Sequence, residues 1–412
     1  MPLRSPRRPR VGEPCRGIGL ALAGGGFLGA AYELGVLAAL AESVDGLELN
    51  RLDAYVGVSA GAFIAAGLAN GKTPHEMVRI FVEDAEMSLD PATMLRPSAH
   101  LWLRALRSAP RAARQAIDAS LSEGLRGGAA VAWQTFERIG RLLPSGFLDV
   151  RPAERTLQAI FAEPGRTNDF RALAGSLRIV ATDIDNGRSV EFGAPGLDHV
   201  PISRAVLASS ALPGLFPPVG IDGRFYVDGV LNKTLHASVA LNQGVGLLLC
   251  VNPLVPFASP ADRPAGAIAK ASLPVILSQS IRTAIRSRMT VGLEKYAITH
   301  PNASIVVFEP RNDDAATFFT RIFTVSSRRR ICEQAYQHTR ADLLARYDDY
   351  SRRFASAGLA LNRGVLRDRQ LTLVRTTPVP VARRAGGLEE GVLRLRHVLD
   401  DLDRALRLAR AG

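Results

Sequence analysis

One stretch of this sequence pairs a nucleophilic side chain with the kind of turn that would expose it. Gly57-Val-Ser59-Ala-Gly61 follows the apolar run 54–58 and precedes a segment of small residues over 62–70. A serine between two glycines at a strand-to-helix turn projects its hydroxyl, because only glycine fits beside so tight a bend. The start of the following helix would favour negative charge beside the serine. The pattern is typical of a nucleophilic serine, and also of a Gly-Ser turn that merely starts a helix.

A second glycine cluster lies one predicted strand earlier. Gly24-Gly25-Gly26 closes the short apolar run 18–23, and Gly29 follows before a predicted helix over 30–43. If the two strands are neighbours, about 4.8 Å apart, the N–H groups of Gly24, Gly25 and Gly26 lie near the serine and can form an oxyanion hole. The same residues match G-x-G-x-x-G, which favours a dinucleotide-binding oxidoreductase as an alternative. That class needs an acid at the end of the second strand, and the chain has none there.

The base that would activate the serine is not obvious from spacing. An ordinary α/β-hydrolase serine follows several strands, whereas Ser59 follows only the second. His199, His236 and His300 lie in no recognisable motif, and surface or core positions account for them equally well. Asp228-Gly229 is different, because it follows the predicted strand 225–227 and a proline-rich loop. A carboxylate at a strand end is a candidate general base.

The elements that must position these residues alternate between strands and helices. Further strands are predicted over 177–182, 189–192, 247–251 and 305–308, with a helix over 202–210. Such alternation with glycine-rich turns predicts an α/β fold with a mostly parallel sheet between helices. Asp183-Ile-Asp185-Asn186-Gly187 reads as a hairpin turn. Its carboxylates could bind a metal, but turn chemistry is the better interpretation, and we expect no metal and no cofactor.

The amino-acid composition limits the kinds of binding partner and the cellular compartment that we expect. The formal net charge is +12, nearly all of it from arginine, which suits anionic membrane surfaces or nucleic acid, although arginine-biased codon usage explains it as well. The sequence lacks zinc-ligand or RNA-binding signatures, so we expect no nucleic acid. Three scattered cysteines indicate a reducing compartment. With no apolar run long enough to span a bilayer, we expect a cytoplasmic protein with at most peripheral membrane contact.

The sequence divides into regions of different character. Residues 1–15 are a basic, proline-rich leader that we expect to be disordered, and 16–340 form the α/β domain. Within it, 73–150 is a helical insert that could cap the site and seat at a membrane interface, or pack on its own domain. Residues 341–412 form a helical C-terminal extension, whose apolar heptads over 388–409 could form a homodimer or dock on their own domain.

Three motifs in this order resemble the patatin-like phospholipase family: Gly24–Gly29, Gly57–Gly61 and Asp228-Gly229. The run Ser209–Pro218 resembles that family's segment between serine and aspartate. The resemblance implies a patatin-like three-layer domain and a serine acyl hydrolase of lipid esters, phospholipase A- or lysophospholipase-like. It implies a Ser–Asp dyad without histidine and an acyl-enzyme intermediate. Ser59 would be the nucleophile and Asp228 the general base, with the backbone of Gly24 to Gly26 as oxyanion hole.

Two positions depart from the family's pattern. The glycine motif usually carries a basic residue where this sequence has Leu28, and the aspartate motif usually ends in Gly-Gly or Gly-Ala where this sequence has Gly229-Val230. The basic residue is credited with supporting the oxyanion hole, so Leu28 implies weaker catalysis or a changed substrate. The alternative is therefore a catalytically weak patatin-like protein that binds a lipid or a partner.

Overall fold

The computed structural model of the 412-residue chain describes residues 17–83, 145–258, 266, 268–271, 273–312 and 325–373. The chain forms two compact units. The first comprises 1–94, 150–212 and 218–378, and the second comprises 95–149, 213–217 and 379–412. In the second unit the description covers only 145–149 and 213–217, where Gly146 and Gly214 form a parallel bridge. Residues 84–144 of the predicted insert 73–150, the leader 1–15 and the heptads at 388–409 lie outside the described residues.

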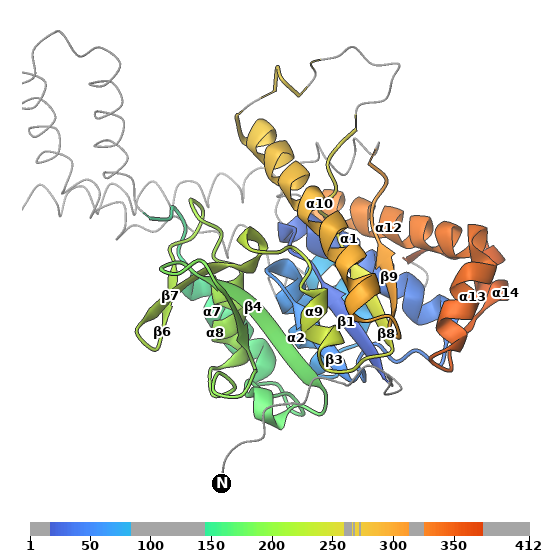
Figure 1. Cartoon of the computed structure of the whole chain (residues 1–412), viewed down its shortest axis with the longest axis horizontal. Helices are drawn as coiled ribbons and strands as arrows, with labels where there is room; N and C mark the ends of the chain where they lie inside the picture. The colour runs from blue at the N-terminus through green and yellow to red at the C-terminus, as the bar shows by residue number, and fades with distance from the viewer. Residues whose placement is uncertain are drawn as a thin grey trace, which may run out of the picture. The chain divides into compact units, whose positions relative to one another are not determined.

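The first unit is built on one mixed sheet of eight strands, counted over the described residues (Figure 1). Its order is β6-β7-β4-β3-β1-β8-β9, and β5 pairs with β4 off this path. Neighbours from β4 to β9 along this order are parallel, whereas β5, β6 and β7 pair antiparallel. The strands are β1 Ile18–Leu22, β3 Ala54–Gly57, β4 Ser176–Asp183, β5 Ser189–Phe192, β6 Val219–Ile221, β7 Arg224–Asp228, β8 Leu247–Val251 and β9 Ser304–Phe308.

Helices cover both faces of this sheet. The α-helices are α1 Gly26–Ser43, α2 Ala60–Ala69, α3 Pro74–Val78, α7 Arg151–Phe161, α8 Ile202–Ser209, α9 Ala237–Leu241, α10 Leu273–Thr299, α12 Val325–Ala345, α13 Tyr347–Ala355 and α14 Arg363–Arg367. A π-helix spans Arg79–Glu83, and single 3-10 turns span Phe170–Ala172 and Gly229–Leu231. A small antiparallel pair joins β2, Val44–Asp45, to β10, Ala360–Leu361.

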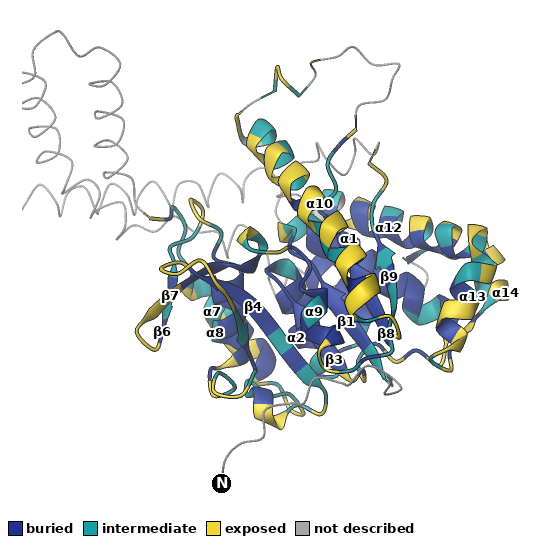
Figure 2. Ribbon diagram, viewed as in Figure 1, coloured by how far each residue is buried: buried dark blue, intermediate teal, exposed yellow. Residues whose placement is uncertain are grey.

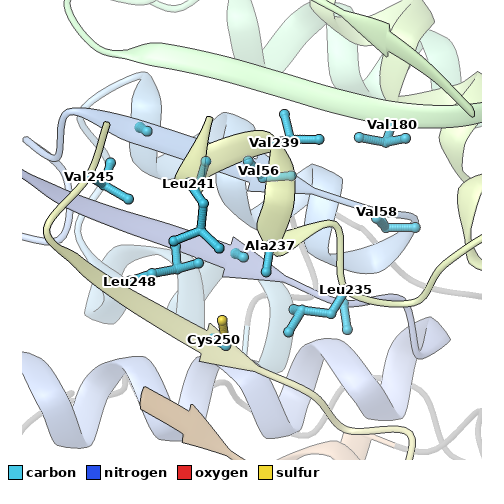
Figure 3. Close-up of a cluster of buried hydrophobic side chains, with 14 of the residues drawn as sticks. Val56, Val58, Val180, Leu235, Ala237, Val239, Leu241, Val245, Leu248 and Cys250 are labelled. Carbon is cyan, nitrogen blue, oxygen red and sulfur yellow. The ribbon is translucent and has the colours of Figure 1, made fainter. Parts of the chain in front are cut away.

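The central strands are apolar throughout because both of their faces are buried. β3 and β8 are buried along their whole length, as expected of parallel strands between two helical layers. On one face, alanines and valines of β1 and β3 and Leu248 and Cys250 of β8 pack against α9 (Figure 3), and Tyr296 of α10 belongs to the same cluster. Alternate residues such as Leu20 and Tyr55 point to the other face. There α2 contacts β1 and β3, and α1 lies along α12, with Gly35 close to the Cys332 carbonyl.

The predicted mostly parallel α/β fold is therefore confirmed, and the predicted hairpin is the β4–β5 pair. Two predicted helix starts are wrong. The first helix begins at Gly26 rather than Ala30, and α2 begins at Ala60, directly after the serine. The boundary predicted between 340 and 341 falls inside α12. Beyond it, two residues of the C-terminal region form β10, a strand too short for the sequence pattern to reveal.

Candidate active site

The register of β4 brings the serine turn and the aspartate turn together. Ile179 pairs with both β3 and β5, whereas Ala181 pairs with both β5 and β7. β5 therefore occupies one edge of β4, and β3 and β7 share the other edge, one after the other. β3 is parallel to β4 and β7 is antiparallel to it, so their carboxyl ends run toward each other. They meet beside Val180, where the chain leaves β3 for Ser59 and leaves β7 at Asp228.

Ser59 sits in the strained turn that its flanking glycines predict. Its φ of 53° and ψ of −121° are unusual for a residue with a side chain. A Cβ on Gly61 would lie 2.5 Å from the Ala23 carbonyl oxygen, and one on Gly57 would lie 2.5 Å from the Ala62 Cα. Both glycines are thus needed for α2 to start directly against the ends of β1 and β3. The serine itself is 8% exposed.

A buried serine on another helix holds this turn in place. The Ser59 backbone N–H donates to Ser209 Oγ at 2.8 Å, and Ser209 Oγ donates to the Val180 carbonyl at 2.6 Å. Ser209 is the last residue of α8 and is fully buried. The relay connects the serine turn to β4 at the place where the two strand ends meet. The sequence offered no spacing signal for Ser209 beyond its place in the run that resembles the family.

Asp228 is a buried carboxylate facing this serine. It is 2% exposed, its backbone N–H donates to the Ala211 carbonyl at 3.0 Å, and its Oδ1 accepts from the Val230 N–H at 2.9 Å. Burial raises the pKa of Asp228 to about 7, opposed by the Val230 N–H and by the Ser59 hydroxyl within hydrogen-bonding reach. A Cβ on Gly229 would lie 2.3 Å from the Val180 carbonyl oxygen, so this turn also requires glycine.

The glycine triplet closes the site from β1, the other neighbour of β3. A Cβ on Gly24 would lie 3.1 Å from the Ser59 Cβ, which places this loop directly beside the serine. Gly26 adopts a φ of 60° with open space around it. Within the described residues, the N–H groups of Gly25 and Gly26 donate to no protein acceptor. They stand at the start of α1, where a helix offers unpaired donors to an anion.

The family's usual basic residue is replaced by Leu28, but an arginine from helix α10 contacts the segment beneath the glycine loop. Pro253 packs where a Cβ on Gly25 or Gly29 would stand, at 2.7 and 3.0 Å. The Arg282 guanidinium of α10 donates to the Pro253 and Val255 carbonyls at 3.4 and 3.2 Å. Leu28 itself is partly buried. Arg282 therefore braces the segment on which the loop rests.

The three histidines considered from the sequence lie elsewhere or face backbone. Exposed His199 pairs with Asp222 at 2.9 Å, and His300 contacts the Thr299 hydroxyl at 2.9 Å. His236 is buried beside the aspartate turn. Burial lowers the pKa of His236 to about 4, and the nearby positive charge of Lys233 lowers it further. Its hydrogen bonds go to backbone at Gly229 and Lys233. Among the described residues, no histidine is bonded to Asp228.

The carboxylates of the β4–β5 turn are used by the turn itself. Asp183 accepts from the Asp185 N–H at 3.0 Å and from Asn186 Nδ2 at 2.9 Å, and it pairs with Arg224 at 3.0 Å. These contacts hold its pKa below the ordinary value, although burial acts in the opposite direction. The interpretation as turn chemistry fits these contacts. In the part of the chain that is described, no cluster of three or more His, Cys, Asp or Glu side chains is arranged to hold a metal ion.

A sheet between helices, with a serine thrust out on the turn after a central strand, is the architecture of α/β acyl hydrolases. Within that class, the chain belongs to the patatin-like phospholipase family, whose profile matches residues 20–241. The matched range includes the glycine triplet.

Two solved structures resemble this chain at low identity. VipD from Legionella pneumophila is 15% identical, with a TM-score of 0.34 over 81% of this chain and 68% of VipD. The type III effector protein ExoU is 17% identical, with a TM-score of 0.35 over 81% of this chain and 54% of ExoU. The chain thus spans about half the length of ExoU. Separately, no helix among the described residues is both long and apolar enough to cross a membrane.

Proposed function

We propose that this protein hydrolyses lipid esters, phospholipids or lysophospholipids, through a Ser59–Asp228 dyad and an acyl-enzyme. The observation that carries the proposal is the meeting of these two side chains at one point of β4. Family membership supports lipid acyl hydrolysis as the kind of reaction. The buried position of Asp228 supports its role as base, because a pKa of about 7 suits proton transfer at neutral pH far better than the ordinary value near 4.

The reaction follows from these positions. The Ser59 hydroxyl attacks the acyl carbon of the ester while Asp228 takes its proton, and the carbonyl oxygen becomes an oxyanion. The N–H groups at Gly24 to Gly26 stabilise this charge. Collapse of the tetrahedral intermediate expels the alcohol, which takes the proton from Asp228, and leaves the acyl group on Ser59. Water then attacks the acyl-enzyme, Asp228 accepts its proton and returns it to Ser59, and the fatty acid leaves.

The proposal is tested by hydrolysis and labelling with matched variants. Ser59→Ala is expected to abolish both phospholipid hydrolysis and labelling by a fluorophosphonate probe, and Asp228→Asn is expected to abolish turnover. Ser189→Ala and Asp185→Asn, at exposed positions of the β4–β5 hairpin, serve as controls and should keep wild-type activity. Labelling retained by Ser59→Ala would refute the nucleophile. Loss of turnover in a histidine variant, with activity retained in Asp228→Asn, would refute the dyad.

A catalytically weak lipid-binding protein is the second candidate, and Leu28 is the observation that favours it. If the missing cation is not replaced, the oxyanion would be poorly stabilised and turnover slow. Fatty-acid release separates the two candidates. A weak enzyme would bind lipid vesicles, yet the wild type would release fatty acid barely faster than Ser59→Ala.

A further inference from the structure

The residues along the outer side of helix α10 are exposed (Figure 2), and several of them are large and aliphatic. Five large apolar residues there are between 50 and 81% exposed, namely Leu273, Leu277, Ile281, Val291 and Ile298. The spacings between them, 4, 4, 10 and 7 residues, are each four or a sum of threes and fours, which places them on one face of the helix. From the first to the last, this face is about 38 Å long at 1.5 Å per residue. Scattered single apolar residues are ordinary on a protein surface, but an aligned row of this length is not.

The opposite side of α10 is fixed to the body of the domain. Ile285 and Tyr296 are buried, Met289 and Leu293 pack on the core of the sheet, and Gln279 exchanges hydrogen bonds with the Phe257 backbone. The helix is therefore held against the domain with its aliphatic row outward. Figure 1 shows α10 in front of the strands.

The row also carries two cations and one acid. Arg288 and Lys295 lie within it at helical spacing from Val291 and Ile298, and both are exposed. The one acid on α10, Glu294, is also exposed and lies at helical spacing from Val291 and Ile298, so the cations of this face exceed its acids by one. Aliphatic side chains mixed with cations on one face match the apolar interior and the anionic headgroups of a lipid surface. An acidic helix of a protein partner would pair with the cations but would not account for the aliphatic residues along most of the row.

The row adjoins the candidate active site. Arg288 Nη1 donates to the Leu231 carbonyl at 3.2 Å, and Leu231 is 42% exposed. Leu231 ends the single 3-10 turn that begins directly after Asp228. On the inner side, Arg282 of the same helix braces the loop beneath the glycine triplet. A surface docked on α10 therefore lies next to the residues that would attack its lipids.

We infer that the outer face of α10 is the surface by which the protein docks on anionic lipid membranes. The choice of a lipid partner rests on the proposed function, but the docking itself does not require catalysis. For this reason binding is measured in the Ser59→Ala protein, so that a failure of docking and a failure of catalysis give different results.

The test compares full-length variants on vesicles of phosphatidylcholine alone and of phosphatidylcholine with 30% phosphatidylglycerol, by co-sedimentation. Two double variants interrupt the row, Leu277→Ser with Ile281→Ser and Val291→Ser with Ile298→Ser. Each is expected to weaken binding about tenfold, because two partly buried aliphatic side chains are lost. Lys295→Gln is expected to weaken binding to the anionic vesicles about fivefold and to leave neutral vesicles unaffected. Ile184→Ser, at a 47% exposed position in the β4–β5 turn, is the matched control.

In the catalytically intact protein, the row variants should slow phospholipid hydrolysis on vesicles and leave hydrolysis of a monomeric short-chain ester unchanged. Wild-type vesicle binding in both double variants would overturn the inference, as would equal binding to neutral and anionic vesicles. A dimer that the double variants convert to monomer, without any vesicle binding, would assign the row to a second copy of the chain. That result would overturn docking on lipid, as would the absence of vesicle binding in a protein that stays monomeric.

Discussion

Replacing Asp228 by asparagine should stabilise the protein while removing its activity. The carboxylate is completely buried, and burial raises its pKa from 3.8 to about 7. Between those two values the unfolded chain gives up the proton and the folded protein keeps it, so folding becomes less favourable as pH rises. At about 1.4 kcal/mol per pH unit, the cost reaches about 4 kcal/mol at pH 7 and stays constant above it. Below pH 3.8 the cost vanishes.

Asparagine has the shape of aspartate and no charge to bury, and its oxygen can still accept from the Val230 N–H. The variant should therefore be more stable than wild type by roughly 2–4 kcal/mol at pH 8 and nearly equal to it at pH 4. Urea unfolding of both proteins at pH 4, 6 and 8 measures the difference. Asp185→Asn, at an exposed position, should show no such pH-dependent gain. A constant difference across this range, or a less stable Asp228→Asn at pH 8, would refute the assignment of a raised pKa.

Other consequences follow from the same contacts. Because Asp228 must be ionised to accept the serine proton, kcat/KM should rise about tenfold per pH unit up to about 7 and then level off; a flat profile from pH 5 to 8 would contradict this. Ser209→Ala removes the acceptor of the Ser59 N–H, so kcat should fall at least tenfold with little change in KM. Ser209→Thr, which keeps the hydroxyl, should recover part of it, and equal loss in both would indicate a packing effect. Arg282→Gln should lower kcat, and adding Leu28→Arg should restore part of it; a variant pair without such rescue would separate Arg282 from the oxyanion loop.

Much of the sheet was predictable because burial on both faces leaves a plain signal. The strands 18–22, 54–57 and 247–251 are short apolar runs bounded by glycine or polar residues, and Asn186-Gly187 marks the hairpin. The helix start at Gly26 was missed because glycine is a poor helix former and its place here depends on a positive φ. Helix α10 was not predicted at all. Apolar residues on both its buried and its exposed sides erase the 3.6-residue period that would reveal it.

The candidate site was only partly predictable from local pattern. Gly57–Gly61 predicts its own turn, since a Cβ on either glycine would collide with the backbone. The pairing of Ser59 with Asp228 depends on which residues of β4 each strand contacts, and no sequence spacing encodes that register. The prediction that Ser59 pairs with Asp228 came from the resemblance to the patatin-like family. The contacts of the Ser209 hydroxyl and the Arg282 guanidinium depend on how their helices pack in the fold. The sequence alone therefore could not assign a role to either residue.

The most direct test of the account is to identify the residue that carries the acyl group during turnover. The protein is mixed with a phospholipid, quenched in acid within the first turnovers and digested, and the peptides are examined by mass spectrometry. The account predicts a fatty-acyl ester on the peptide containing Ser59 and its accumulation in Asp228→Asn if acylation still proceeds slowly. An acyl group on another residue, or fatty acid released at full rate by Ser59→Ala, would contradict it.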